Sequence, residues 1–271
     1  MKKITLFFTL SLMVSLTFAQ EKPQNDASDA DALAKKLQNP ISSLISVPFQ
    51  GNFDFGYGPS NGTRFVMNIQ PVIPVSISEN WNLINRIILP VISQTDIYGK
   101  SGNQFGLGDA VVSGFFSPKA PTSGGLIWGV GPVLSVPTAT DELLGSEKFG
   151  VGPTAVALKQ VGKLTIGLLV NHVWSVAGNA DRADVNSSFF QPFLAKNFAG
   201  GYAVNINTEL AQNWDADATV GTINIGASKV ITMGKQMAQI SAGPRIPYGN
   251  ANGSDWGFRA QFTLLFPAGS K

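Results

Sequence analysis

The sequence has no cysteine, a single histidine and few charged residues. Without cysteine the chain can form no disulfide, no Cys-based zinc site and no thiol nucleophile, and one histidine excludes a His-rich metal site. Charged residues make up 13% of the chain, where soluble proteins average about 25%. This composition argues against disorder, coiled coils and an ordinary helical cytosolic enzyme. We therefore expect no metal and no cofactor.

The charge balance and the apolar runs exclude two further classes. With 19 basic and 17 acidic residues the net charge is +2, so no basic excess points to nucleic acid as a partner. After residue 20 no apolar run approaches the ~20 residues that a membrane-spanning helix needs.

The first residues have the layout of a secretory signal peptide. Met1–Gln20 contains two lysines, an apolar run and the small-x-Ala sequence Thr17-Phe18-Ala19. We expect cleavage after residue 19 and export of an electrically balanced chain. The alternative, an N-terminal membrane anchor, is less favoured because the run is short and is not followed by basic residues.

Residues 20–43 form a polar leader that contains one predicted helix, Asp29–Gln38. Acidic residues begin it and lysines lie near its end, which suits the helix dipole, and Pro40 stops it. Ten residues are marginal alone, so this helix needs a surface on which to dock.

From Ile45 onward apolar and polar residues alternate. The pattern is clearest from Ile45 to Tyr57 and from Trp256 to Phe266, and a period of two predicts strands. About twelve strands follow from this rule: 44–58, 63–77, 81–94, 105–117, 126–138, 149–161, 163–176, 188–199, 201–213, 219–231, 236–248 and 256–266.

The connections predict the kind of sheet. Tight turns mostly alternate with longer loops, which is typical of transmembrane barrels with turns on the periplasmic side. Strands of about 11–14 residues are long enough to cross hydrocarbon when tilted. The sequence therefore predicts an all-β, transmembrane antiparallel up-and-down β-barrel over residues 44–266, followed by a C-terminal tail, 267–271. A secreted soluble β-sandwich or lipocalin-like barrel is the alternative.

Two sets of residues favour the membrane barrel. The polar faces of the strands carry charges that suit a wet lumen, and we take them as lumen-lining candidates: Asp54, Arg64, Arg86, Glu209, Arg245 and Arg259. They either pair with one another and set the pore size or form a constriction that selects solutes. The tryptophans lie near predicted strand ends, as interface girdles do: Trp81 and Trp128 on the turn side, and Trp174, Trp214 and Trp256 on the loop side.

Two blocks near the N-terminus resemble a known family. ALAKKLQNPISSLISVPFQGNFDFGYGP (32–59) and FVMNIQPVIPVSISENWNLINRIILPVI (65–92) are similar to outer-membrane proteins of the MetA-pathway of phenol degradation family. The likeness continues through GLGD (106–109), GPVLSVPTAT (131–140) and FTLLFP (262–267). It implies an outer-membrane barrel that passes small solutes, aromatic or apolar molecules among them.

The resemblance sets the expected function and partners. We expect a channel that works by passive diffusion, or alternatively a non-conducting structural or adhesion barrel. The partners would be membrane lipid, lipopolysaccharide, small solutes and the barrel-assembly machinery. Many outer-membrane barrels end on a terminal Phe, whereas Phe266 is followed here by five further residues.

Two smaller expectations concern His172 and the predicted helix. A barrel hydrolase needs a serine beside the histidine, and Ser175, three positions away on a strand, faces the other side, so we expect no enzyme. The helix is expected to cap or partly plug the periplasmic mouth, with its two lysines meeting Asp54 or Glu209, unless it is a frayed tail.

Overall fold

The structure is a computed structural model that describes residues 24–58, 60–99, 102–251 and 253–266. The predicted signal peptide, 1–19, and the tail, 267–271, lie outside these residues. Within them the elements are α1 (Gln24–Leu37), β1 (Ile45–Tyr57), β2 (Gly62–Ile69), β3 (Val72–Ser76), β4 (Trp81–Thr95), β5 (Asn103–Leu107), β6 (Ala110–Pro118), β7 (Leu126–Val136), β8 (Lys148–Val161), β9 (Leu164–Gly178), β10 (Asn186–Asn197), β11 (Tyr202–Asn213), β12 (Ala218–Met233), β13 (Gln236–Gly249) and β14 (Trp256–Phe266). α1 is not long and apolar enough to cross a membrane.

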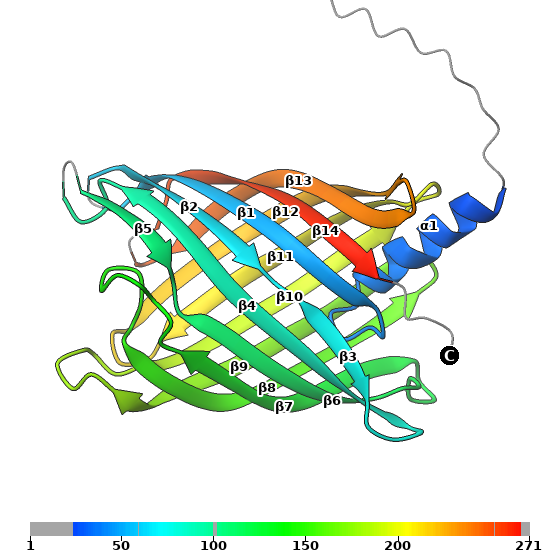
Figure 1. Ribbon diagram of the computed structural model, residues 1–271, viewed down its shortest axis with the longest axis horizontal. Coiled ribbons are helices and arrows are strands. Elements are labelled where there is room, and N and C mark those ends of the chain that lie inside the picture. The colour runs from blue at the N-terminus through cyan, green and yellow to red at the C-terminus, as the bar shows by residue number, and fades with distance from the viewer. Residues whose placement is uncertain (1–23, 59, 100–101, 252, 267–271) are drawn as a thin grey trace, which may run out of the picture.

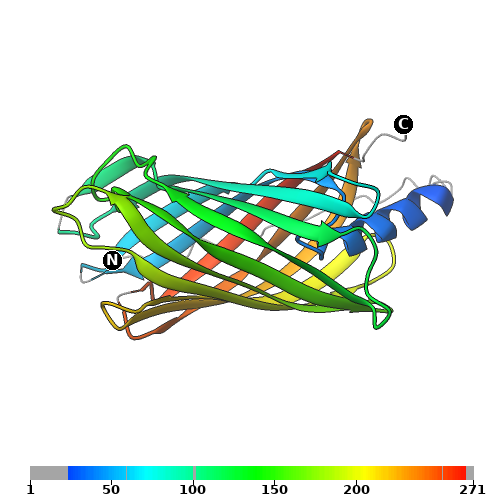
Figure 2. The same ribbon diagram turned by 90° about the horizontal axis from the view of Figure 1, so that it is seen from below.

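The strands close into a single antiparallel barrel (Figure 1). Neighbours in the sheet follow the chain order, and β1 pairs with β14 from Ile45↔Phe266 to Phe55↔Trp256, which leaves no open edge. β2 and β3 share one position in the sheet, as do β5 and β6, so the barrel has 12 strands in all. The predicted fold class and strand number are confirmed. The strands run obliquely to the barrel axis (Figure 2).

Two predicted strands are interrupted. The strand expected at 63–77 breaks into β2 and β3 before Pro71, which has no N–H to donate to the ladder. The strand expected at 105–117 breaks into β5 and β6 at Gly108 and Asp109. Here the chain bends because the Asp109 side chain binds the β7–β8 loop.

The longer loops at one rim are held by polar side chains. Asp109 accepts hydrogen bonds from the N–H of Ala139 (3.2 Å) and from the N–H and hydroxyl of Ser146 (2.6 and 2.7 Å). Lys148 at the start of β8 forms an ion pair with Asp184 in the β9–β10 loop (2.9 Å). This hydrogen bond from Lys148 lowers the pKa of the Asp184 carboxyl.

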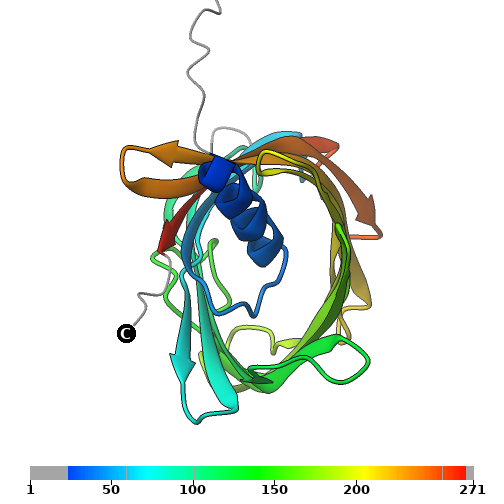
Figure 3. The same ribbon diagram turned by 90° about the vertical axis from the view of Figure 1, so that its right-hand side faces the viewer.

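The N-terminal helix is longer than predicted and lies across one mouth of the barrel (Figure 3). It begins at Gln24 rather than Asp29 and ends at Leu37. The unfavourable step in helix formation is nucleation, and packing against the barrel offsets it in the docked turns. Further polar residues can then extend the helix at little cost, which explains why it begins at Gln24. Its apolar stripe packs on Leu44, Val230 and Leu265 and consists of Ala30, Leu33, Ala34 and Leu37.

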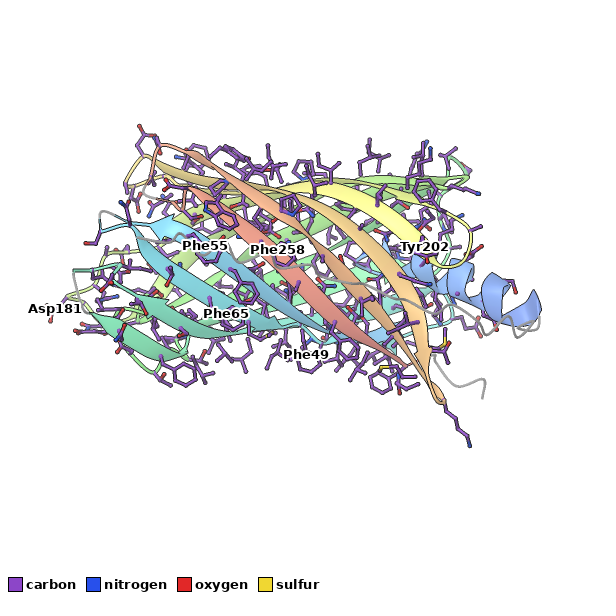
Figure 4. The ribbon with its side chains drawn as sticks, turned by 90° about the horizontal axis from the view of Figure 1, so that it is seen from above. Phe49, Phe55, Phe65, Asp181, Tyr202 and Phe258 are labelled. Carbon is purple, nitrogen blue, oxygen red and sulfur yellow. The ribbon has the colours of Figure 1, made fainter. Side chains whose placement is uncertain are left out.

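The barrel has its apolar residues outside and many polar residues inside. Apolar side chains along the strands are exposed, including Phe53, Ile73, Val75, Ile166, Val204, Ile206, Ile225, Ile240, Ile246 and Phe258. Phe55 and Phe258 lie on the outer surface of β1 and β14 (Figure 4). Polar side chains on the opposite faces are buried, including Asn52, Asp54, Gln94, Thr154, Asn224, Gln239, Arg245 and Thr263. A soluble barrel requires the reverse arrangement, so this alternative is wrong.

A pair of adjacent residues on β11 tests this assignment of faces. Ile206 is 43% exposed on the outer face, whereas Asn205 lines an internal cavity. Ile206→Arg should destabilise the barrel by roughly 2–4 kcal/mol, because it places a charge in hydrocarbon. Asn205→Arg should have a much smaller effect. Denaturant titration of protein folded into lipid vesicles measures both, and a larger loss for Asn205→Arg would contradict the assignment.

Candidate functional site

The lumen contains a network of four charged side chains from β1, β11, β13 and β14. Arg259 donates to both carboxylate oxygens of Glu209, at 2.9 and 2.8 Å. Arg245 donates from Nε to Asp54 Oδ1 at 2.9 Å, and its Nη1 lies 3.7 Å from Glu209. Four of the six lumen-lining candidates therefore meet, although Asp54 and Arg259 are 205 positions apart along the chain.

Two uncharged residues connect the ion pairs. Asn52 Oδ1 accepts hydrogen bonds from Arg245 (3.1 Å) and from Arg259 (2.7 Å), and Asn224 Oδ1 accepts from Arg245 (3.0 Å). Neither asparagine is among the sequence candidates. Alternation along the strands could have identified them as inward-facing, because Asn52 is two positions from Asp54 and therefore lies on the same face.

The other two lumen candidates form their hydrogen bonds outside this network. Arg64 Nη1 donates to the Tyr57 hydroxyl at 3.1 Å, and Arg86 Nη2 donates to Gln70 Oε1 at 2.9 Å. Strict alternation from Ile45 predicts that Tyr57 lies on the apolar face with Phe55, whereas Tyr57 lines a cavity with Asn52 and Asp54. Gly56 has a φ of +69° and the register shifts between Phe55 and Tyr57, so this bulge turns Tyr57 into the lumen.

One wall of the lumen is apolar, which alternation did not predict. Ile84, Phe115, Val156, Leu158 and Leu169 on β4, β6, β8 and β9 form a buried cluster on inward faces. Ile41, from the segment between α1 and β1, is 4% exposed and joins the same cluster. The chain preceding the barrel therefore reaches into its interior.

The docked helix does not use its lysines as predicted. Within the described residues, Asp54 and Glu209 form ion pairs with Arg245 and Arg259, and neither Lys35 nor Lys36 pairs with them. The helix is held by other contacts. Asp31 Oδ1 accepts from the N–H of Gly201 at 2.6 Å, and Gln160 Nε2 donates to the carbonyl of Lys35 at 2.9 Å.

The tryptophans lie at the two rims of the barrel. Trp81 and Trp128 stack edge-to-face, with ring centroids 5.8 Å apart, near the starts of β4 and β7. Trp174, Trp214 and Trp256 lie near the opposite rim and are 48%, 56% and 57% exposed. Such positions suit aromatic rings at a membrane–water boundary, and the interface girdle stays a prediction.

His172 has a partner that sequence spacing could not identify. Ser188 of β10 lies opposite His172 in the sheet, and its hydroxyl is 2.7 Å from His172 Nδ1. Trp214 Nε1 also donates to Ser188 Oγ, at 2.9 Å. No described residue hydrogen-bonds to His172 Nε2, so the part of the chain described here supplies no acid that orients the ring. These side chains form a polar cluster on the outer face, and no metal-binding group of three or more His, Cys, Asp or Glu occurs among the described residues.

No family model and no curated protein sequence matches the chain. Among solved structures, the COG4313 outer membrane channel from Pseudomonas putida F1 is similar, with a TM-score of 0.65 and 15% identity over 83% of this chain and 96% of that chain. The beta domain of the Bordetella autotransporter BrkA has a TM-score of 0.43 and 13% identity over 83% of this chain and 100% of that chain. The first likeness shows that this chain has the fold of an outer-membrane β-barrel, and the second is too distant to add to it.

The Asp54–Arg245 pair is expected to stabilise the closure between the first and last strands. Both side chains are at most 10% exposed, and removing one partner leaves an uncompensated buried charge. Arg245→Ala should therefore lower the free energy of unfolding by roughly 3–5 kcal/mol. The double variant Asp54→Asn/Arg245→Gln should recover a large part of this loss. Denaturant titration measures both, and equal losses in the two variants would contradict the expected role of the pair.

Proposed function

We propose that the chain is an outer-membrane channel through which small solutes, aromatic or apolar molecules among them, diffuse passively. The observation that carries this proposal is the distribution of residues about the barrel wall. Exposed apolar side chains surround it, whereas arginines, carboxylates and amides face the lumen. A non-conducting structural or adhesion barrel would not need so many charged groups in its interior.

The location follows from the same distribution. A continuous apolar outer surface is stable only in hydrocarbon, and the predicted signal peptide supplies the export route. Lipid and lipopolysaccharide are then the partners of the outer face. Phe266 closes β14 against Ile45, and we propose that the barrel-assembly machinery binds this internal aromatic residue.

The interior suits solutes with both polar and apolar parts. Amide and guanidinium groups on β1, β13 and β14 line one part of the lumen, and an apolar cluster on β4, β6, β8 and β9 lines another. A solute that passes between them loses water on one side and finds hydrogen-bond partners on the other. The solute gradient is the driving force.

A second function is favoured by one specific observation. α1 and Ile41 fill part of the mouth on the side where the turns are short. If this segment never moves, the barrel is a non-conducting structural or adhesion protein.

Two alanines of α1 offer a matched test. Ala34 is fully buried between α1 and the barrel, whereas Ala32 is exposed on the same helix. Ala34→Glu places a charge in the docking contact and should release the helix. In planar bilayers, we expect wild-type channels to conduct, Ala34→Glu to conduct at least about twofold more, and Ala32→Glu to match the wild type.

A boiled-against-unboiled gel shift confirms that each variant is folded. Absence of conductance in the wild type and in folded Ala34→Glu would contradict the channel and favour the structural barrel. Conductance that is equal in all three proteins would leave the channel in place and show that the helix does not restrict it.

A further inference from the structure

A cavity of about 240 Å³ lies inside the barrel, between the segment that follows α1 and the strands. Gln38, Asn39 and Pro40 border it on the side of the mouth, and residues of β1, β3, β4, β10, β11, β13 and β14 form its walls. Its volume is below the roughly 300–1,000 Å³ that is typical of drug-sized ligand sites. A small molecule is therefore the expected occupant.

The charges around this cavity have one sign. Arg86 and Arg259 line it together with several amide and hydroxyl side chains, and none of the described residues that line it is acidic. Amide and guanidinium groups donate hydrogen bonds. The cavity is thus suited to an anion.

Arg86 is the arginine whose charge is available. Arg259 is bound at both guanidinium Nη atoms by Glu209. Arg86 donates to the neutral Gln70, and no carboxylate of the described residues lies within 4.0 Å of it. Glu209 also interacts with Arg86 electrostatically, but both of its oxygens accept hydrogen bonds from Arg259. A guanidinium that lines a cavity can bind a carboxylate well, because two parallel hydrogen bonds can form.

Part of the cavity lining is apolar. Phe193 and Val72 line it, and both also pack against the apolar cluster of the lumen. Val72 is the cross-strand neighbour of Arg86 in the β3–β4 ladder, so apolar surface lies directly beside the guanidinium. An inorganic anion would use the arginine and leave this apolar surface unused, whereas an organic acid uses both.

We propose that this cavity binds small organic carboxylates, with the carboxylate on Arg86 and the hydrocarbon part against Phe193 and Val72. The inference deepens the proposed channel function, because it names the class of solute that the lumen takes up. It does not require conduction in order to be tested. The site would hold the solute on the periplasmic side of the Arg245–Arg259 network.

Calorimetric titration of the folded, full-length mature protein in detergent tests the proposal, with benzoate as the probe and benzyl alcohol as its uncharged counterpart. Wild-type protein should bind benzoate at least about tenfold more tightly than benzyl alcohol. Arg86→Gln should weaken benzoate binding by about tenfold or more and leave benzyl alcohol unchanged. Arg64→Gln removes the same charge from another part of the lumen and should change benzoate binding by less than about twofold.

Other variants keep the test decisive if Arg86→Gln does not fold. Phe193→Ala should weaken benzoate binding and leave acetate binding unchanged, because acetate has no ring to pack. Crystals soaked in 4-bromobenzoate should show the bromine near Phe193. Equal affinity for benzoate and benzyl alcohol, or equal effects of Arg86→Gln and Arg64→Gln, would overturn the proposal. Benzoate binding that depends on Arg86 in a barrel that does not conduct would contradict the channel and support this site.

Discussion

The structure depends on one constraint: no backbone hydrogen-bonding group of a strand can remain unpaired in hydrocarbon. The ladder between β1 and β14 satisfies it, because it joins the first and last strands along their whole shared length. Once the sheet is closed, every strand has a lipid face and an interior face. The alternation of apolar and polar residues then decides the surface that faces each environment.

Closure also explains the charges inside. Asp54 and Arg245 come from β1 and β13, the strands on either side of β14, and their ion pair crosses β14. Arg259 on β14 joins Asn52 to Glu209. The same side chains therefore stabilise the junction and line the lumen, so a substitution that changes the lumen here also changes stability.

Much of the fold follows from sequence because membrane barrels obey a strict period of two. This alternation of apolar and polar residues predicts the strand number, the lumenal position of Arg259 and the outer position of Phe258. The assignment of faces by alternation fails where the backbone departs from regular strand geometry. Gly56, whose backbone is left-handed, turns Tyr57 inward, and this departure is visible only in the three-dimensional structure. Pro71 divides one predicted strand into two.

The candidate site was harder to predict than the fold. Alternation along a strand predicts that a side chain enters the lumen. It does not predict which other side chain it contacts, because register and strand tilt determine the partners. Arg86 and Glu209 share the lumen, yet Arg259 binds the acid. The apolar wall was missed because strands such as β8 carry small or apolar residues on both faces, as Ala155 and Val156 show.

The absence of cysteine allows the most direct test of a water-filled lumen. Single cysteines introduced along β11, from Ala203 to Leu210, can be exposed to a membrane-impermeant maleimide in intact proteoliposomes. The account predicts labelling at Asn205, Asn207 and Glu209 and protection at Val204, Ile206 and Leu210. Labelling on the second set alone, or on neither set, would contradict a barrel with an aqueous passage.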